Sequence, residues 1–153
     1  MEISELYNIF KQSAGICTDT RKIKSNVLFF ALKGPNFNAN KLAKQAIEEG
    51  AIAAIIDDKD FLSEKCILVD DALKTLQDLA HFHRAKFNIP ILGITGSNGK
   101  TTTKELIAEV LKTKYKTHFT KGNYNNHIGV PLTLLEMPLD TEIAIIEMGA
   151  NHI

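Results

Sequence analysis

The chain has 153 residues, a formal net charge of zero and 44% hydrophobic side chains, which is enough to bury one ordinary core or two small ones. A balanced charge provides no basic surface of the kind that nucleic acids or anionic membranes require, so we expect neither as a partner and a small molecule instead. No apolar run approaches the length of a membrane span, and the N-terminus lacks the features of a signal peptide. Cys17 and Cys66 have no C-x-x-C spacing, which favours two buried thiols in a reducing cytoplasm.

Helix-like and strand-like segments alternate along the chain. The first helix pattern covers residues 39–50, with apolar residues spaced three or four apart on one face and Gly50 as its stop. Apolar runs around this helix predict buried strands within residues 26–34, 51–57 and 65–71. A longer helix pattern then runs from Ala72 to about Phe87.

We predict a domain boundary after residue 88, because Asn88-Ile89-Pro90 breaks the second helix and a new strand-turn-helix unit follows. That unit begins with the strand ILGIT and ends near Tyr115. A short strand at 117–120, a polar loop at 121–129, a helix opened by Pro131 and a strand at 142–149 come next. This alternation predicts an α/β fold in which parallel strands are joined by crossover helices, with residues 1–88 and 89–153 as separate domains.

The stretch Thr95-Gly96-Ser97-Asn98-Gly99-Lys100-Thr101 lies between a predicted strand and a predicted helix. A phosphate cradle needs inward backbone N–H groups, glycines, a helix N-terminus, a lysine for charge and a hydroxyl for Mg²⁺. Here Lys100 can reach the β- and γ-phosphates and Thr101 can bind Mg²⁺, although the usual first glycine is displaced from position 94 to Gly93. The alternative is a glycine-rich turn with a solvated lysine. The predicted nucleotide contacts are Gly96, Ser97, Asn98, Gly99, Lys100, Thr101 and Thr102.

With its displaced glycine, this loop resembles that of the Mur ligases, which reads G-x-T-G-[ST]-N-G-K-[ST]. The segments GKTTTKE and GNYNNHIGVPLTLL are most similar to the Mur ligases that join D-alanyl-D-alanine to UDP-N-acetylmuramoyl-tripeptide. The resemblance implies a monomeric, cytoplasmic, ATP- and Mg²⁺-dependent ligase of peptidoglycan precursor synthesis, acting through an acyl phosphate. It also implies that residues 1–88 form a small α/β domain that recognises the UDP-muramoyl substrate, and that residues 89–153 begin a phosphate-loop ATPase domain with a mainly parallel sheet.

Three residues beyond the phosphate loop gain roles from the same resemblance. Asn125 and Asn126 are expected to line the cleft where ATP and the muramoyl substrate meet, although Asn-rich loops taken alone are commonly only turns. Glu147 ends an apolar strand at its carboxyl end, where ligands of open parallel sheets bind. The resemblance makes Glu147 a Mg²⁺ ligand together with Thr101, and makes Lys100 and Glu147 the catalytic residues.

In the first domain, Thr18-Asp19-Thr20-Arg21 resembles the [ST]-x-[ST]-R segment that Mur ligases place near the diphosphate of their substrate. Thr20 and Arg21 are therefore candidate substrate contacts, since a guanidinium can bond two oxygens at once. An Asp–Arg pair that holds a turn is an equal alternative. The following loop reads Asn38-Ala39-Asn40 where Mur ligases often have D-G-H, which leaves the uridine contacts open.

The chain ends at EMGANHI, whereas Mur ligases continue with a carbamylated lysine, a second Mg²⁺ site and the dipeptide contacts. The resemblance therefore implies an N-terminal fragment that is inactive alone. Other readings stay open: another Mur step such as addition of the third amino acid, a different phosphate-loop protein such as a kinase or nucleotide switch, or a non-catalytic module that binds a UDP-sugar or nucleotide.

Overall fold

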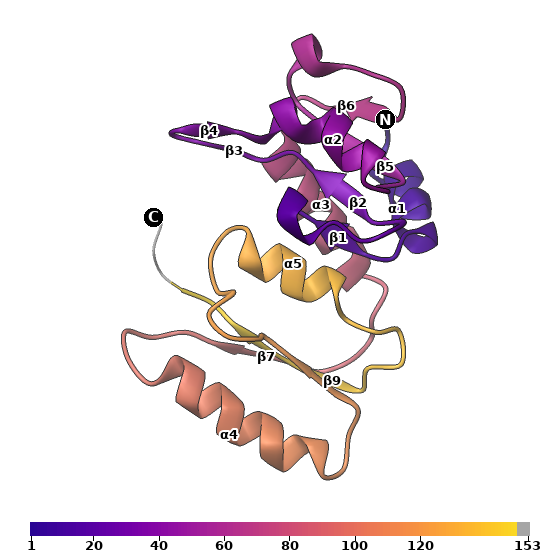
Figure 1. Cartoon of the computed structure of the whole chain (residues 1–153). Coiled ribbons are helices and arrows are strands. Elements are labelled where there is room, and N and C mark those ends of the chain that lie inside the picture. Colours follow the sequence, from indigo (N-terminus) through magenta and orange to yellow (C-terminus); the bar gives the residue numbers. More distant parts are fainter. Residues whose placement is uncertain (150–153) are drawn as a thin grey trace. The chain divides into compact units, whose positions relative to one another are not determined.

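A computed structural model describes residues 1–149, which divide into two compact units (Figure 1). The first unit is Met1–Phe82, and the second begins at His83, inside helix α3 (Ala72–Arg84). No helix among the described residues is both long and apolar enough to cross a membrane.

The first unit contains a parallel sheet with the strand order β1-β2-β5-β6. Its strands are β1 (Ile16–Cys17), β2 (Leu28–Phe30), β5 (Ala53–Ile56) and β6 (Cys66–Leu68). The last three lie inside the apolar runs that predicted strands, and their pairing confirms the parallel α/β class. A short antiparallel hairpin, β3 (Lys33–Gly34) and β4 (Phe37–Asn38), follows β2.

Helices cover both faces of this sheet. Helix α2 (Ala43–Glu48) is preceded by the 3₁₀ helix η2 (Ala39–Leu42), and together they form the helix predicted at 39–50. Their alanines pack with Phe29, Ala54 and Ile56 in one buried cluster. Leu28, Phe30 and Ile55 alternate with these residues along the strands and are fully buried on the opposite face.

Helix α1 (Ile3–Gln12) and the part of α3 up to Phe82 also belong to the first unit. Tyr7 of α1 meets Phe82 of α3 edge to face, with ring centroids 5.0 Å apart. Two short 3₁₀ helices, η1 (Thr20–Lys22) and η3 (Lys59–Phe61), complete the unit. Cys17 is buried as predicted, whereas Cys66 is half-buried, and both are free thiols.

The second unit contains a parallel sheet with the order β7-β9-β8. Its strands are β7 (Ile91–Ile94), β8 (Thr117–Phe119) and β9 (Ile143–Glu147). Helix α4 (Lys100–Lys112) and helix α5 (Gly129–Leu135) cover opposite faces of this sheet, as Figure 1 shows. The central strand β9 is therefore almost completely buried.

Helix α5 begins at Gly129, so the prediction that Pro131 opens it was wrong by two residues. The side chain of Asn126 accepts the backbone N–H groups of Ile128 at 3.0 Å and Gly129 at 2.8 Å, which starts the helix earlier. Pro131 fits the first turn because a residue there needs no N–H partner inside the helix.

Two histidines are held inside the second unit by backbone carbonyls. His83 Nε2 lies 3.2 Å from the carbonyl oxygen of Met137, and His118 Nε2 lies 2.7 Å from that of Thr133. Burial lowers the pKa of both imidazoles below the usual 6.5, and this outweighs the hydrogen bonds, which raise it. Both side chains are therefore neutral at pH 7.

These lowered pKa values predict that the second unit loses stability in mild acid. The unfolded chain binds protons at these histidines more readily than the folded chain, so the free energy of unfolding should fall as the pH drops below about 6.5. It should level off once the pH passes below the pKa of the folded state. The measurement is the melting temperature at pH 8 and at pH 5. Between these two pH values the melting temperature of His118→Gln should fall less than that of the wild type, and the two decreases should differ by roughly a few degrees. His81→Gln, which changes an exposed histidine, should follow the wild type; parallel curves for all three proteins would contradict the prediction.

Candidate active site

The predicted phosphate loop, residues 95–99, joins the end of β7 to the start of α4. Two of its residues have backbone conformations that favour glycine, with φ of +138° at Gly96 and +78° at Gly99. Gly99 is the N-cap of α4, and its carbonyl accepts the N–H of Thr103 at 2.9 Å. The first N–H groups of a helix have no partner inside the helix, so this turn forms the kind of helix end that binds anions.

Lys100 is the first residue of α4, and its side chain folds back over the loop. Its Nζ donates to the carbonyl oxygen of Gly96 at 2.5 Å. The ammonium group therefore lies against the loop backbone, the position in which it can neutralise a phosphate held by the loop. The other predicted nucleotide contacts are exposed on the loop and the first turn of α4: Ser97, Asn98, Thr101 and Thr102.

Glu147 is the last residue of β9 and only 1% exposed. The strand register pairs it with Ile94, directly before the phosphate loop. Its Oε1 accepts from Nδ2 of Asn125 at 2.8 Å, and Thr101 Oγ1 lies 3.2 Å from Oε1 and 3.1 Å from Oε2. The fold thus brings together Thr101, Asn125 and Glu147, three of the residues predicted to form the site.

Two residues that were not predicted complete the surroundings of Glu147. Thr120 follows β8, and its Oγ1 accepts the backbone N–H of Glu147 at 2.9 Å. Lys104 of α4 is fully buried, with its Nζ 3.5 Å from Oε2 of Glu147. Lys104 follows Thr101 by three positions, which places both residues on one face of the helix. This spacing is the only signal in the sequence for the contact between Lys104 and Glu147.

This group of oxygens suits a Mg²⁺ ion bound together with a nucleotide. Among the described residues no cluster of three or more His, Cys, Asp or Glu side chains could hold a metal ion by itself. Mg²⁺ bound with nucleotides is commonly held by one or two protein oxygens, phosphate oxygens and water. The hydroxyl of Thr101 and the carboxylate of Glu147 fit that requirement.

The two asparagines of the predicted cleft differ in what their side chains contact. Asn125 reaches Glu147, and its backbone carbonyl accepts the N–H of Gly149 at 2.6 Å. Asn126 instead uses its side-chain oxygen to accept the two backbone N–H groups that begin α5. In this structure, therefore, Asn125 lies at the site and Asn126 caps a helix beside it.

In the first unit, Thr20 and Arg21 lie in η1, which Asp19 caps. The guanidinium of Arg21 bonds both carboxylate oxygens of Asp19, from Nε at 2.9 Å and from a terminal nitrogen at 2.8 Å. This hydrogen-bonded pair lowers the pKa of Asp19 and raises that of Arg21. The structure thus contains the turn-holding pair that was the alternative reading, while the guanidinium stays mostly exposed, at 87% of its side chain.

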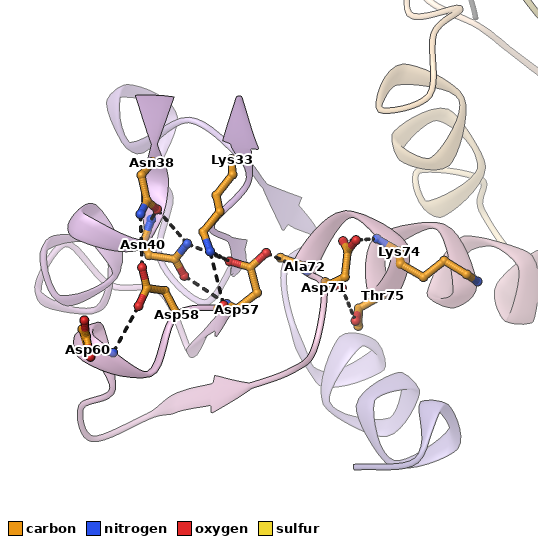
Figure 2. Close-up of polar contacts among 10 residues, drawn as sticks. All are labelled: Lys33, Asn38, Asn40, Asp57, Asp58, Asp60, Asp71, Ala72, Lys74 and Thr75. Atoms are coloured by element: carbon orange, nitrogen blue, oxygen red, sulfur yellow. Dashed lines mark hydrogen bonds and ion pairs between the residues drawn. The ribbon is translucent and has the colours of Figure 1, made fainter. Parts of the chain in front are cut away.

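The segment Asn38-Ala39-Asn40 belongs to a polar network at the carboxyl ends of β2 and β5 (Figure 2). Asn40 is 1% exposed; its Nδ2 donates to Asp57 at 2.9 Å, and its Oδ1 accepts the backbone N–H of Asp57 at 3.0 Å. Lys33 pairs with the same carboxylate at 3.0 Å. Burial raises the pKa of Asp57, but its bonds from Lys33, Asn40 and the N–H of Ala72 outweigh burial and lower it overall. Asn40 therefore holds the hairpin region to β5.

Comparison with known proteins points to one family for the second unit. Residues 94–153 match the model of the Mur ligase middle domain. The second unit is thus similar to the middle domain of the Mur ligases. The sequence of the chain is 48% identical over 141 residues to the UDP-N-acetylmuramoyl-tripeptide–D-alanyl-D-alanine ligase of Bacillus subtilis, and 39% identical over 137 residues to that of Escherichia coli. Each alignment covers 90% of this chain but only 31% and 30% of the relative, so the chain spans about a third of their length.

Solved structures of Mur ligases show the same similarity. A crystal structure of MurF from Acinetobacter baumannii is 31% identical with a TM-score of 0.86, over 98% of this chain and 36% of that one. MurF ligase from Thermotoga maritima, solved in complex with ADP, is 33% identical with a TM-score of 0.83, over 92% of this chain and 33% of that one.

The cap at α5 predicts that replacing Asn126 reduces stability. In Asn126→Ala the N–H groups of Ile128 and Gly129 lose their acceptor, which should lower the free energy of unfolding by about 1 kcal/mol. Asn123→Ala, three positions earlier in the same exposed loop, should change it by less than about 0.5 kcal/mol. Urea unfolding of both variants measures the difference, and equal stabilities would show that the cap does not stabilise α5.

Proposed function

We propose that the second unit binds ATP and Mg²⁺ at the phosphate loop, as the beginning of the ATP-binding domain of a ligase. In this proposal the ligase adds D-alanyl-D-alanine to UDP-N-acetylmuramoyl-tripeptide. The names of the related ligases support these substrates, and the ADP complex of the Thermotoga maritima relative supports the nucleotide. Because the chain spans about a third of its relatives, we propose that ligation needs further sequence like theirs.

One observation carries the proposal: a buried carboxylate lies beside the hydroxyl of a phosphate-loop threonine. The two carboxylate oxygens of Glu147 lie 3.2 and 3.1 Å from Thr101 Oγ1, at the carboxyl ends of two paired parallel strands. A glycine-rich turn with a solvated lysine would not require a carboxylate that is 1% exposed beside it. A hydroxyl and a carboxylate in this arrangement suit a divalent cation shared with phosphate oxygens.

Each residue then has a part in positioning and charge balance. ATP would transfer its γ-phosphoryl group to the terminal carboxylate of the tripeptide and leave as ADP. The amine of D-alanyl-D-alanine would then attack the resulting acyl phosphate, and the amide forms as inorganic phosphate leaves and the amine loses a proton. The loop N–H groups and Lys100 would hold the phosphates and neutralise their charge. Thr101 and Glu147 would hold Mg²⁺, while Asn125 fixes one oxygen of Glu147. No side-chain nucleophile is needed for this reaction.

We propose that the first unit recognises the UDP-muramoyl substrate, with Thr20 and Arg21 near its diphosphate. The guanidinium of Arg21 is mostly exposed and already aligned by Asp19, so it can accept further oxygen partners. A nucleotide-activated precursor agrees with a cytoplasmic location. That location and a monomeric state remain predictions.

The experiment that tests the function measures phosphate release by the full-length gene product with ATP, Mg²⁺ and pairs of acceptors. We expect turnover with UDP-N-acetylmuramoyl-tripeptide and D-alanyl-D-alanine, and none with the muramoyl dipeptide and a single amino acid. Lys100→Ala should lower the rate at least a hundredfold, because the phosphoryl group in transfer loses its charge partner. Lys112→Ala, at the far end of α4, should keep the wild-type rate. Turnover with the dipeptide pair would assign the neighbouring step, and full activity of Lys100→Ala would reject the phosphate loop.

A second prediction concerns Arg21. Arg21→Ala should raise the KM for the UDP-muramoyl substrate several-fold and leave the KM for ATP unchanged, because only the muramoyl substrate would contact the first unit. Lys22→Ala is the matched control, since Lys22 is the next residue and is also exposed. If neither KM changes in Arg21→Ala, the Asp19–Arg21 pair only holds the turn.

A further inference from the structure

Lys104 is a charged side chain that the fold buries completely. It lies in the second turn of α4, and its relative exposure is 0%. Its Nζ donates to the carbonyl oxygen of Gly122 at 3.0 Å and lies 3.5 Å from Oε2 of Glu147 and 3.7 Å from Oε1 of Glu105. Among the described lysines that form ion pairs, the others keep at least 39% of their side chains exposed.

This burial has an energetic cost that the surroundings must offset. Removing an ammonium group from water costs several kcal/mol, which is recovered only where other groups bond it and balance its charge. The carboxylate of Glu147 is buried as deeply as Lys104, whereas that of Glu105 is 59% exposed and screened by water. The pairing with Glu147 and the bond to Gly122 therefore account for the position of Lys104.

The two partners of Lys104 belong to different parts of the site. Glu147 ends β9, while Gly122 lies in the loop that leads to Asn125, and Asn125 donates to the other oxygen of Glu147. Lys104 thus connects α4, this loop and β9 by direct contacts. Thr101 and Lys104 approach the same oxygen, Oε2, from one face of α4.

We propose that Lys104 is a positioning residue, which holds the carboxylate of Glu147 and the loop before Asn125 in the arrangement that binds Mg²⁺ with the nucleotide. The inference rests on the proposed function, because it takes Glu147 and Thr101 as the Mg²⁺ ligands. The proposed role requires no contact of Lys104 with the cation or the phosphates. Lys104 acts through the oxygen of Glu147 that it contacts and through the loop.

Two effects of Lys104 on Mg²⁺ affinity oppose each other. Its positive charge makes the site less attractive to a cation, whereas its contacts keep the ligand oxygens oriented. Residues that orient a metal ligand typically contribute ten- to a hundredfold to metal affinity. Glu147 is almost completely buried, so without Lys104 its carboxylate must move to reach another donor. We therefore expect the loss of orientation to be the larger of the two effects on Mg²⁺ affinity.

The test measures ATP binding to the 153-residue chain by calorimetry, once with Mg²⁺ and once with EDTA. Lys104→Met keeps an unbranched side chain that is one atom shorter, but removes its charge and its donor. We expect this variant to bind ATP at least tenfold more weakly with Mg²⁺ and as well as the wild type with EDTA. Lys112→Met on the same helix should equal the wild type in both titrations.

A double variant shows whether Lys104 acts through Glu147. In Glu147→Gln the carboxylate that Lys104 would position is absent. Adding Lys104→Met to this variant should therefore cause no further loss of Mg²⁺-dependent affinity for ATP. Lys104→Gln removes the charge with a smaller change of polarity. It serves as the second single variant if Lys104→Met does not fold, as judged by circular dichroism.

Each outcome decides the proposal. An equal loss of affinity with Mg²⁺ and with EDTA, or an additive loss in the double variant, would mean that Lys104 only supports the fold and would overturn it. Unchanged Mg²⁺-dependent binding in the folded single variants would also overturn it, while leaving the proposed function intact. A wild-type chain that binds ATP equally with and without Mg²⁺ would overturn both the metal site and the role of Lys104.

Discussion

The site depends on one buried carboxylate, that of Glu147 at the end of β9. A carboxylate removed from water must be surrounded by donors or balanced by charge, and here three side chains meet that requirement: Thr101, Lys104 and Asn125. These side chains come from α4 and from the loop before α5, so the single constraint fixes how both segments lie against the sheet. Helix α4 begins directly after the predicted phosphate loop, so the contacts that hold α4 also hold this loop.

Features that depend on neighbouring residues could be predicted from the sequence. The apolar runs at β2, β5, β6, β7 and β9 are strands, of which β2, β5 and β9 are buried and β6 and β7 are partly exposed. Their alternation with helix patterns was enough to predict parallel sheets. A phosphate loop is a prediction that rests on glycines, lysine and threonine being adjacent in the chain, and the structure places these residues between β7 and α4. Helix α1 was missed, although Glu2 and Glu5 form a reciprocal cap at its start that the sequence contains.

Features that depend on distant contacts could not be predicted in the same way. A lysine four positions after Lys100 has the pattern of a solvated side chain, and only the fold shows that Lys104 meets a carboxylate from a strand far along the sequence. The opposite holds for Arg21, whose partner is two residues away, so that the pair with Asp19 was already an alternative from the sequence alone. Of two adjacent asparagines, the fold brings one to Glu147 and uses the other to start a helix.

The strand order of the second unit has a consequence for synthesis on the ribosome. The strands β7 and β8 do not pair with each other; each pairs with β9, which is made last among the described elements. While the chain emerges, β7 and β8 have no described strand to pair with in this sheet until β9 is made. The first unit has all its described strands before residue 69 and can form its core earlier. Domains generally fold as units in the order of synthesis, so the contacts around Glu147 would form in a late step, when Glu147 has left the exit tunnel.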